Sequence, residues 1–267
     1  MASLQVHRTN RWLTVAALAC AASVVVAAQE STLQSGQLLQ LFTTATDQQG
    51  QVVSGLIKDD FVVLDNDKPQ TPTLFEIDVQ PITAIVLIDR SASMIGTFEP
   101  LVAAVDRFVR ALRPQDQVRA GTFSDKVQFT SHFTSNPDEL IPELKQLAFG
   151  NGTKLHEALL ASFDDLRGKP GLRVVIAITD GEDTDSRIPR SKVLERERTD
   201  NVIVYAIGLE TQYFNGQQVV RNIPGRGLRE LAEQTGGGYL EARRNANIAA
   251  IFARINQELH SHYLLGF

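Results

Sequence analysis

Oxygen-bearing side chains follow one of the unbroken apolar runs of this chain. Asp89, Ser91 and Ser93 alternate with other residues directly after the run at 82–88. Such hard ligands, delivered from one tight loop, suit magnesium, manganese or calcium better than zinc or copper. The segment alone fits a solvated loop as well as a cation site. Further oxygen ligands elsewhere in the chain are needed to favour the cation site.

Two later segments add oxygen atoms in matching places. Asp180 follows the apolar run at 174–179 as Asp89 follows its own run, and Thr153 ends a Gly-x-Gly-Thr segment that opens a helical pattern. In an open α/β sheet, ligands bind outside the carboxyl ends of the strands at the topological switch point. We therefore predict a metal site formed by Asp89, Ser91, Ser93, Thr153 and Asp180.

The elements that must position these residues form a doubly wound α/β pattern. Buried-type runs alternate with amphipathic segments, which is typical of a mostly parallel sheet flanked by helices. The predicted strands are 82–88, 118–123, 127–133, 173–179, 202–209 and 238–241. The predicted helices are 99–112, 137–147, 154–166, 189–199, 228–234 and 248–260. Asn215-Gly216 in the longest connection predicts a small hairpin insertion.

The residues before this pattern are strand-like. Segment 29–79 has short apolar runs separated by turn residues and no helical period, so we expect a small β-rich accessory segment. Residues 263–267 read as a terminal strand. The α/β domain is expected to span 80–262.

Together, the three oxygen-bearing segments resemble the von Willebrand factor A-type family in order and spacing. The resemblance implies a Rossmann-like fold and a metal-ion-dependent adhesion site that holds Mg²⁺, or Mn²⁺ or Ca²⁺. It implies that Ser91 and Ser93 coordinate the metal, that Thr153 binds directly or through water, and that Asp89 and Asp180 act mainly through water and hydrogen bonds. A partner's Asp or Glu would complete the octahedron.

Two residues of the first loop depart from the family pattern. Ala92 stands where many relatives have Gly, and Arg90 is unusual beside a cation. We expect Arg90 to point away from the metal. Neither departure removes an oxygen ligand, so the predicted site is retained.

The β-rich segment also resembles the region that precedes the A-type domain in a group of exported bacterial proteins. The likeness rests on the turn at 47–50, on Gly55-Leu56 and Asp60-Phe61, and on the closing Tyr-x-Leu-Gly-aromatic strand at 263–267. In those relatives further strands follow, so we expect the accessory unit here to be reduced or to be completed by a partner.

The first 28 residues have the features of an export signal. Arg8 and Arg11 precede the apolar run at 12–26, which ends in Ala27-Ala28. A cleaved signal peptide is favoured over an uncleaved membrane anchor, and lipidation at Cys20, the only cysteine, is a third option. We expect an extracytoplasmic protein: periplasmic, bound to the cell envelope or secreted.

Charge and missing motifs narrow the function classes. The net charge of −5 becomes −7 without residues 1–28, which disfavours nucleic acid and anionic lipid as partners. Neither a Gly-x-Ser-x-Gly elbow nor a phosphate-binding glycine loop follows the first buried strand. We expect a non-enzymatic protein that mediates adhesion or protein–protein interaction. The alternatives are a metal-dependent phosphoester hydrolase and a structural envelope protein with a vestigial site.

The remaining acids and histidines favour ordinary roles. Residues 182–185 read as an acidic surface loop, and His156 as a helix-surface residue. His260 and His262 form a stray pair with no third zinc ligand, and His132 has no evident partner.

Overall fold

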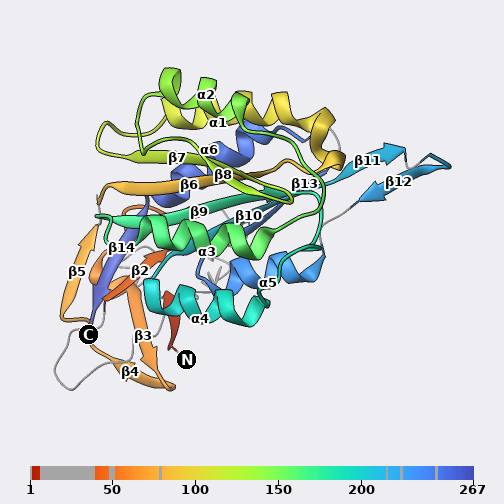
Figure 1. Cartoon of the computed structure of the whole chain (residues 1–267). Coiled ribbons are helices and arrows are strands. Elements are labelled where there is room, and N and C mark those ends of the chain that lie inside the picture. Colours follow the sequence, from red (N-terminus) through yellow and green to blue (C-terminus); the bar gives the residue numbers. More distant parts are fainter. Residues whose placement is uncertain are drawn as a thin grey trace, which may run out of the picture. The chain divides into compact units, whose positions relative to one another are not determined.

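The computed structural model describes residues 2–6, 40–47, 52–77, 80–214, 216–222, 225–243 and 246–267 (Figure 1). The chain divides into two compact units. The β unit consists of Met1–Val79 and Gln257–Phe267, and the α/β unit consists of Gln80–Asn256.

The α/β unit is built on a six-stranded sheet in the order β13-β10-β9-β6-β7-β8. Its strands are β6 (Ile82–Asp89), β7 (Gln117–Phe123), β8 (Val127–Phe129), β9 (Leu172–Thr179), β10 (Ile203–Leu209) and β13 (Tyr239–Ala242). Neighbouring strands are parallel except for the antiparallel pair β7–β8. All eight residues of β6 are buried, as an apolar strand at the centre of a parallel sheet requires.

Helices cover both faces of this sheet, which confirms the predicted doubly wound α/β fold (Figure 1). They are α1 (Phe98–Arg110), α2 (Pro137–Gln146), α3 (Leu155–Leu166), α4 (Arg190–Asp200), α5 (Arg226–Gln234) and α6 (Ile248–Leu259). Helices α3, α4 and α5 pack their apolar side chains against one face. On the other face α1 meets α6, where the ring centroids of Phe108 and Phe252 lie 5.2 Å apart.

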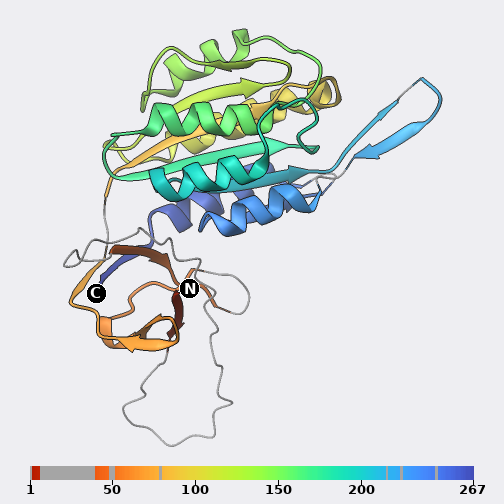
Figure 2. The ribbon, with the colours of Figure 1, turned by 60° about the horizontal axis from the view of Figure 1, so that its bottom comes forward.

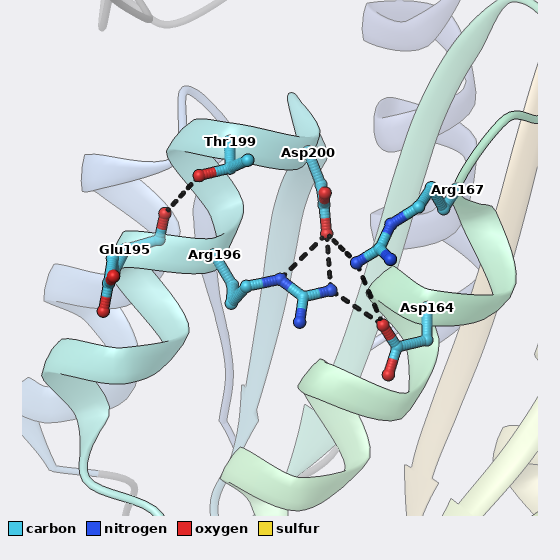
Figure 3. A network of polar contacts seen from close by, with 6 residues as sticks. All are labelled: Asp164, Arg167, Glu195, Arg196, Thr199 and Asp200. Atoms are coloured by element: carbon cyan, nitrogen blue, oxygen red, sulfur yellow. Dashed lines mark hydrogen bonds and ion pairs between the residues drawn. The ribbon is translucent and has the colours of Figure 1, made fainter.

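A network of charged side chains joins the ends of α3 and α4 (Figure 3). Arg196 donates hydrogen bonds to Asp164 at 2.7 Å and to Asp200 at 2.9 Å, and Arg167 contacts both carboxylates at 3.2 and 3.4 Å. The Asp200 side chain is only 7% exposed, so its two arginine partners compensate a largely desolvated charge. The network therefore links two helices that share one face of the sheet.

The predicted insertion is an antiparallel hairpin of β11 (Thr211–Phe214) and β12 (Val219–Asn222). Residue 215, half of the predicted Asn-Gly turn, lies outside the described residues. Figures 1 and 2 both show the hairpin projecting from the α/β unit near the carboxyl end of β10.

The described residues of the β unit form two small sheets, ordered β1-β3-β4 and β2-β14-β5. Its strands are β1 (Ala2–Val6), β2 (Gln40–Thr44), β3 (Phe61–Asp65), β4 (Lys68–Gln70), β5 (Leu74–Ile77) and β14 (His262–Gly266), and its 3-10 helix is η1 (Lys58–Asp60). The predicted terminal strand is thus paired on both edges. The hydroxyl of Tyr263 accepts a hydrogen bond from the Leu56 amide and donates one to the Val53 carbonyl, both at 3.1 Å, inside a small apolar core.

Most of the predicted export signal falls on residues that the structure does not describe. Residues 2–6 form β1, which pairs with β3, whereas the apolar run at 12–26 and Cys20 lie outside the described ranges. Within those ranges, none of the helices has the length and apolar character needed to cross a membrane.

Candidate metal site

The first oxygen-bearing loop and Asp180 follow two strands that are neighbours in the sheet. Asp89 is the last residue of β6, and Asp180 comes directly after β9. The two strands pair in parallel, with Ile88 opposite Ile178, so their carboxyl ends lie side by side. The chain continues from β6 to β7 on one side and β9 leads to β10 on the other, which makes this the topological switch point of the sheet.

Hydrogen bonds fix the Asp89 carboxylate in place. One carboxylate oxygen, Oδ1, accepts from the Ser91 amide at 2.8 Å, and the other, Oδ2, accepts from the Thr179 hydroxyl at 2.6 Å. Asp89 is fully buried. These two bonds fix the turn that leads into the 3-10 helix η2 (Ala92–Thr97). Ser91 and Ser93 are thereby held at the carboxyl end of β6.

A chain of polar contacts continues from this turn to Asp180. The hydroxyls of Ser91 and Ser93 lie 3.2 Å apart, and the Ser93 hydroxyl donates to Oδ1 of Asp180 at 3.1 Å. Oδ2 of Asp180 accepts a hydrogen bond from the hydroxyl of Thr211, the first residue of the hairpin. Four of the five predicted ligands are therefore brought into one connected group.

Thr153 reaches this region by a different route. Its amide donates to the Thr184 hydroxyl at 3.1 Å, and its carbonyl accepts from the Thr184 and Asp185 amides at 3.1 and 3.3 Å. Gly152 before it has φ +74°, a conformation that favours glycine. The structure thus ties the Thr153 loop to the loop after β9, while the Thr153 hydroxyl itself hydrogen-bonds to none of the described residues.

The electrostatics of the group favour a cation. Asp89 and Asp180 are 0% and 1% exposed, and neither forms an ion pair with a side chain in the described ranges. Burial raises the pKa of Asp89 to about 6, and the neighbouring charge of Asp180 adds to this against the lowering effect of its hydrogen bonds. Two buried carboxylates without a cationic partner are costly, and a bound divalent cation would remove that cost.

The chemistry of the donors also fits a hard cation. Two carboxylates and three hydroxyls offer only oxygen atoms, which is the ligand set that Mg²⁺, Mn²⁺ and Ca²⁺ prefer. A cluster of three or more His, Cys, Asp or Glu side chains suited to a metal does not occur among the described residues. A site built from three hydroxyls and two carboxylates contains no such cluster.

Arg90 lies in the first loop, but among the described residues it forms no ion pair with Asp89 or Asp180. Its guanidinium is buried between two aromatic rings, 3.8 Å from the ring centroid of Phe98 and 3.7 Å from that of Phe149. It also donates to the Leu144 carbonyl at 3.4 Å. The arginine therefore anchors the loop to neighbouring segments.

Asp183 in the acidic loop and His156 in α3 are less exposed than predicted. Asp183 is mostly buried and accepts hydrogen bonds from the His156 and Ser186 amides at 2.8 and 2.9 Å. Lys154, at the N-cap of α3, makes no side-chain cap of its own, so Asp183 caps this helix from another loop. The His156 ring is also mostly buried and bonds the Ile188 carbonyl at 2.8 Å, so the surface interpretation was wrong for both residues. Glu182 and Asp185 are exposed, as predicted.

His262 and His132 have contacts that involve none of the proposed ligands. His262 is buried in β14 and lies 3.0 Å from the Thr44 hydroxyl, and burial lowers its pKa to about 4. His132 does have partners: the Ser131 hydroxyl at 2.7 Å and Glu139 at 3.4 Å.

Thr179 and Thr211 hydrogen-bond to the two buried carboxylates but were not among the predicted site residues. Thr179 was visible as the residue before Asp180, at the end of a predicted strand. Thr211 lies 31 residues after Asp180 and is brought to it only because β10 pairs with β9.

Comparison with known proteins identifies the family of the α/β unit. Residues 84–182 match the sequence model of the von Willebrand factor type A domain. No curated protein sequence shows a significant match.

Solved structures that share the fold include the three that follow. An aerotolerance-related membrane protein from Bacteroides fragilis is 18% identical, with a TM-score of 0.55, and the match covers 67% of this chain and 98% of that one. The von Willebrand factor domain of the type V pili tip protein Mfa5 from Porphyromonas gingivalis is 13% identical, with a TM-score of 0.51 and coverage of 67% and 94%. Proximal thread matrix protein 1 from the mussel byssus, solved with a zinc-occupied metal-ion-dependent adhesion site, is 13% identical, with a TM-score of 0.56 and coverage of 73% and 49%.

Proposed function

This chain belongs to the von Willebrand factor type A domain proteins, and from that premise we propose that its α/β unit is an interaction module that binds a divalent cation and, through it, a carboxylate of a protein partner. The proposed ligand set is Asp89, Ser91, Ser93, Thr153 and Asp180. The observation that carries the proposal is the pair of buried carboxylates, Asp89 and Asp180, that have no cationic side chain to compensate them in the described ranges.

The contacts support a division of roles among these residues. The Asp89 carboxylate already accepts two protein hydrogen bonds, which suits a residue that acts through water and orients the loop. The hydroxyls of Ser91 and Ser93 lie at the start of η2 and can turn their lone pairs toward a metal. The Thr153 hydroxyl is the additional oxygen that the neighbouring loop contributes.

A site of this composition keeps a bound divalent cation electron-poor. Hydroxyl ligands carry no charge, and in this proposal Asp89 and Asp180 act mainly through water, so the ion would keep few direct charged ligands and would attract an added carboxylate. An Asp or Glu of a protein partner would supply that carboxylate. This is binding chemistry, and the proposal includes no catalytic step.

We infer from the first 28 residues that the protein acts outside the cytoplasm. Arg8, Arg11 and the following apolar run have the order of a signal peptide. Two structural relatives fit such a location by name, one as a membrane protein and one as a pili tip protein.

Capture of partners in magnesium and in chelator tests the proposed function. Wild-type protein and a Ser93→Ala variant would be immobilised and exposed to an envelope extract of the source organism. Ser131→Ala is the matched control, because Ser131 follows β8 near the amino end of β7, at the opposite edge of the sheet. We expect partners that bind wild type and the control in magnesium, and that are lost with chelator or Ser93→Ala. Partners indifferent to both changes would contradict the mechanism.

A further inference from the structure

Large apolar side chains are exposed at three places in the described part of the α/β unit. Ile95, Phe149 and Val219 are 60%, 42% and 65% exposed. Exposed apolar groups that gather around a polar centre mark interaction sites more often than scattered ones do. We refer to these three side chains as the apolar rim.

Each residue of the apolar rim belongs to a segment that carries or contacts the proposed metal ligands. Ile95 lies in η2, two residues after Ser93. Phe149 precedes the Gly-x-Gly-Thr loop that ends at Thr153. Val219 lies in β12, in the hairpin whose Thr211 donates to Asp180. Ile95 and Phe149 therefore lie within about four residues of a proposed ligand in the chain, whereas Val219, opposite Phe214, lies toward the tip of the projecting hairpin.

Phe149 is exposed and nevertheless held in position. One face of its ring packs on the Arg90 guanidinium at 3.7 Å, and its edge meets the buried Phe98 ring with centroids 5.5 Å apart. The next residue, Gly150, donates its amide to the Arg90 carbonyl at 3.2 Å. A ring fixed in this way loses little conformational freedom on binding, which favours its use as a contact for a partner.

Arg90 also connects this ring to the ligands. It lies between Asp89 and Ser91 in the chain, and its amide donates to the Phe123 carbonyl at 2.9 Å. The position of the aromatic ring and that of the first ligand loop are therefore set by the same residue.

We propose that the apolar rim selects partner segments in which an Asp or Glu is flanked by apolar side chains. This inference rests on the proposed function, because the carboxylate is placed by charge complementarity with the bound cation. In an extended segment successive residues rise about 3.3 Å, so the neighbours of a metal-bound acid lie within reach of side chains that border the site. An acid flanked by apolar residues would bury the rim, whereas one flanked by polar residues would leave it in water.

A pair of synthetic peptides tests the selection. They have equal length and blocked ends, and differ only in the core, Leu-Asp-Leu in one and Ser-Asp-Ser in the other. Each is titrated into the full chain in magnesium and in chelator. The variants are Phe149→Ser and Ile95→Ser, with Ile57→Ser as the matched control, because Ile57 is equally exposed, at 61%, but belongs to the β unit.

We expect wild type in magnesium to bind the Leu-Asp-Leu peptide at least about fivefold more tightly than the Ser-Asp-Ser peptide, the effect of one good apolar contact. The preference should shrink in both rim variants and persist in Ile57→Ser. Magnesium affinity, measured by calorimetry without peptide, should not change in Ile95→Ser, since Ile95 is neither a proposed ligand nor part of the Arg90 stack. Phe149→Ser removes one ring of that stack, so its peptide affinities are compared at saturating magnesium.

Two results overturn the inference in distinguishable ways. If the protein binds magnesium but binds the two peptides equally, or binds neither, the proposed role of the apolar rim is refuted. The proposed metal site is then unaffected. Failure of wild type to bind magnesium would refute the proposed function and the rim with it. Magnesium-dependent self-association of the full chain that Ile95→Ser abolishes would assign the rim to a second copy, which also contradicts a distinct partner.

Discussion

Glu197 is fully buried on α4, and this carboxyl makes a sharp prediction about stability. Burial raises its pKa from 4.5 to about 8, with a small opposing effect from the charge of Arg198. The folded protein therefore keeps a proton at neutral pH that the unfolded chain releases above pH 4.5. Stability is consequently lost as the pH rises from about 4.5 to 8.

Replacing Glu197 with Gln removes this loss. Each pH unit between the two pKa values costs the folded state about 1.4 kcal/mol, so at pH 7 the wild-type carboxyl costs roughly 3 kcal/mol. The amide has the size of the protonated carboxyl and takes up no proton. We expect Glu197→Gln to be more stable than wild type by roughly that amount at pH 7, and to differ little at pH 4.5.

Urea unfolding of the full chain, followed by helical circular dichroism at pH 4.5 and 7, measures the difference. Most of the described helical residues belong to the α/β unit, so the signal reports the unit that contains Glu197. Glu195→Gln is the matched control, because this exposed residue lies on the same helix. A wild-type stability independent of pH across this range, or an equal gain in the control, would refute the reasoning.

Three further perturbations have expected outcomes. Because burial lowers the pKa of His262 to about 4, the β unit should lose stability as the pH falls from 6.5 toward 4. Hydrogen exchange of the β14 amides should become faster over this range in wild type. The acceleration should be smaller in His262→Gln and as large as in wild type in His132→Gln. Arg90→Lys replaces a planar group stacked between two rings, so magnesium affinity by calorimetry should fall several-fold, and an unchanged affinity would show that the stack does not support the loop. Asp200→Asn should lower the free energy of unfolding by about 1–3 kcal/mol, whereas the exposed Asp138→Asn should change it by less than about 1 kcal/mol; equal effects would contradict the role given to the α3–α4 network.

The fold was predictable wherever a residue pattern has one structural reading. The short, β-branched apolar run at 82–88 favoured a buried strand and forms β6, and the face of α1 formed by Leu101, Val105 and Phe108 is buried as its period predicts. The Asn-Gly signal predicted the β11–β12 hairpin from local chemistry.

Features that depend on contacts between distant segments were not predictable in this way. The bond from Thr211 to Asp180 needs the order of β9 and β10, and the capping of α3 by Asp183 needs the path of the loop after β9. Arg90 stood out as a charge in an unexpected place, but its aromatic partners come from α1 and from the segment after α2. No periodicity in a sequence carries such information.

The proposed ligand set, in contrast, came from three short motifs whose order matched a family. In the structure Asp89, Ser91, Ser93 and Asp180 are connected by hydrogen bonds at one edge of the sheet. Their role as metal ligands, and that of Thr153, is still a proposal.

Calorimetric titration of the full chain with magnesium is the most direct test of that proposal. The comparison uses wild type, Asp89→Asn, which keeps the size of the side chain but removes its charge, and the remote Asp138→Asn as control. We predict that wild type and the control bind one ion per chain, and that Asp89→Asn binds at least about tenfold more weakly. Equal magnesium binding by all three proteins, or none by wild type, would contradict the account.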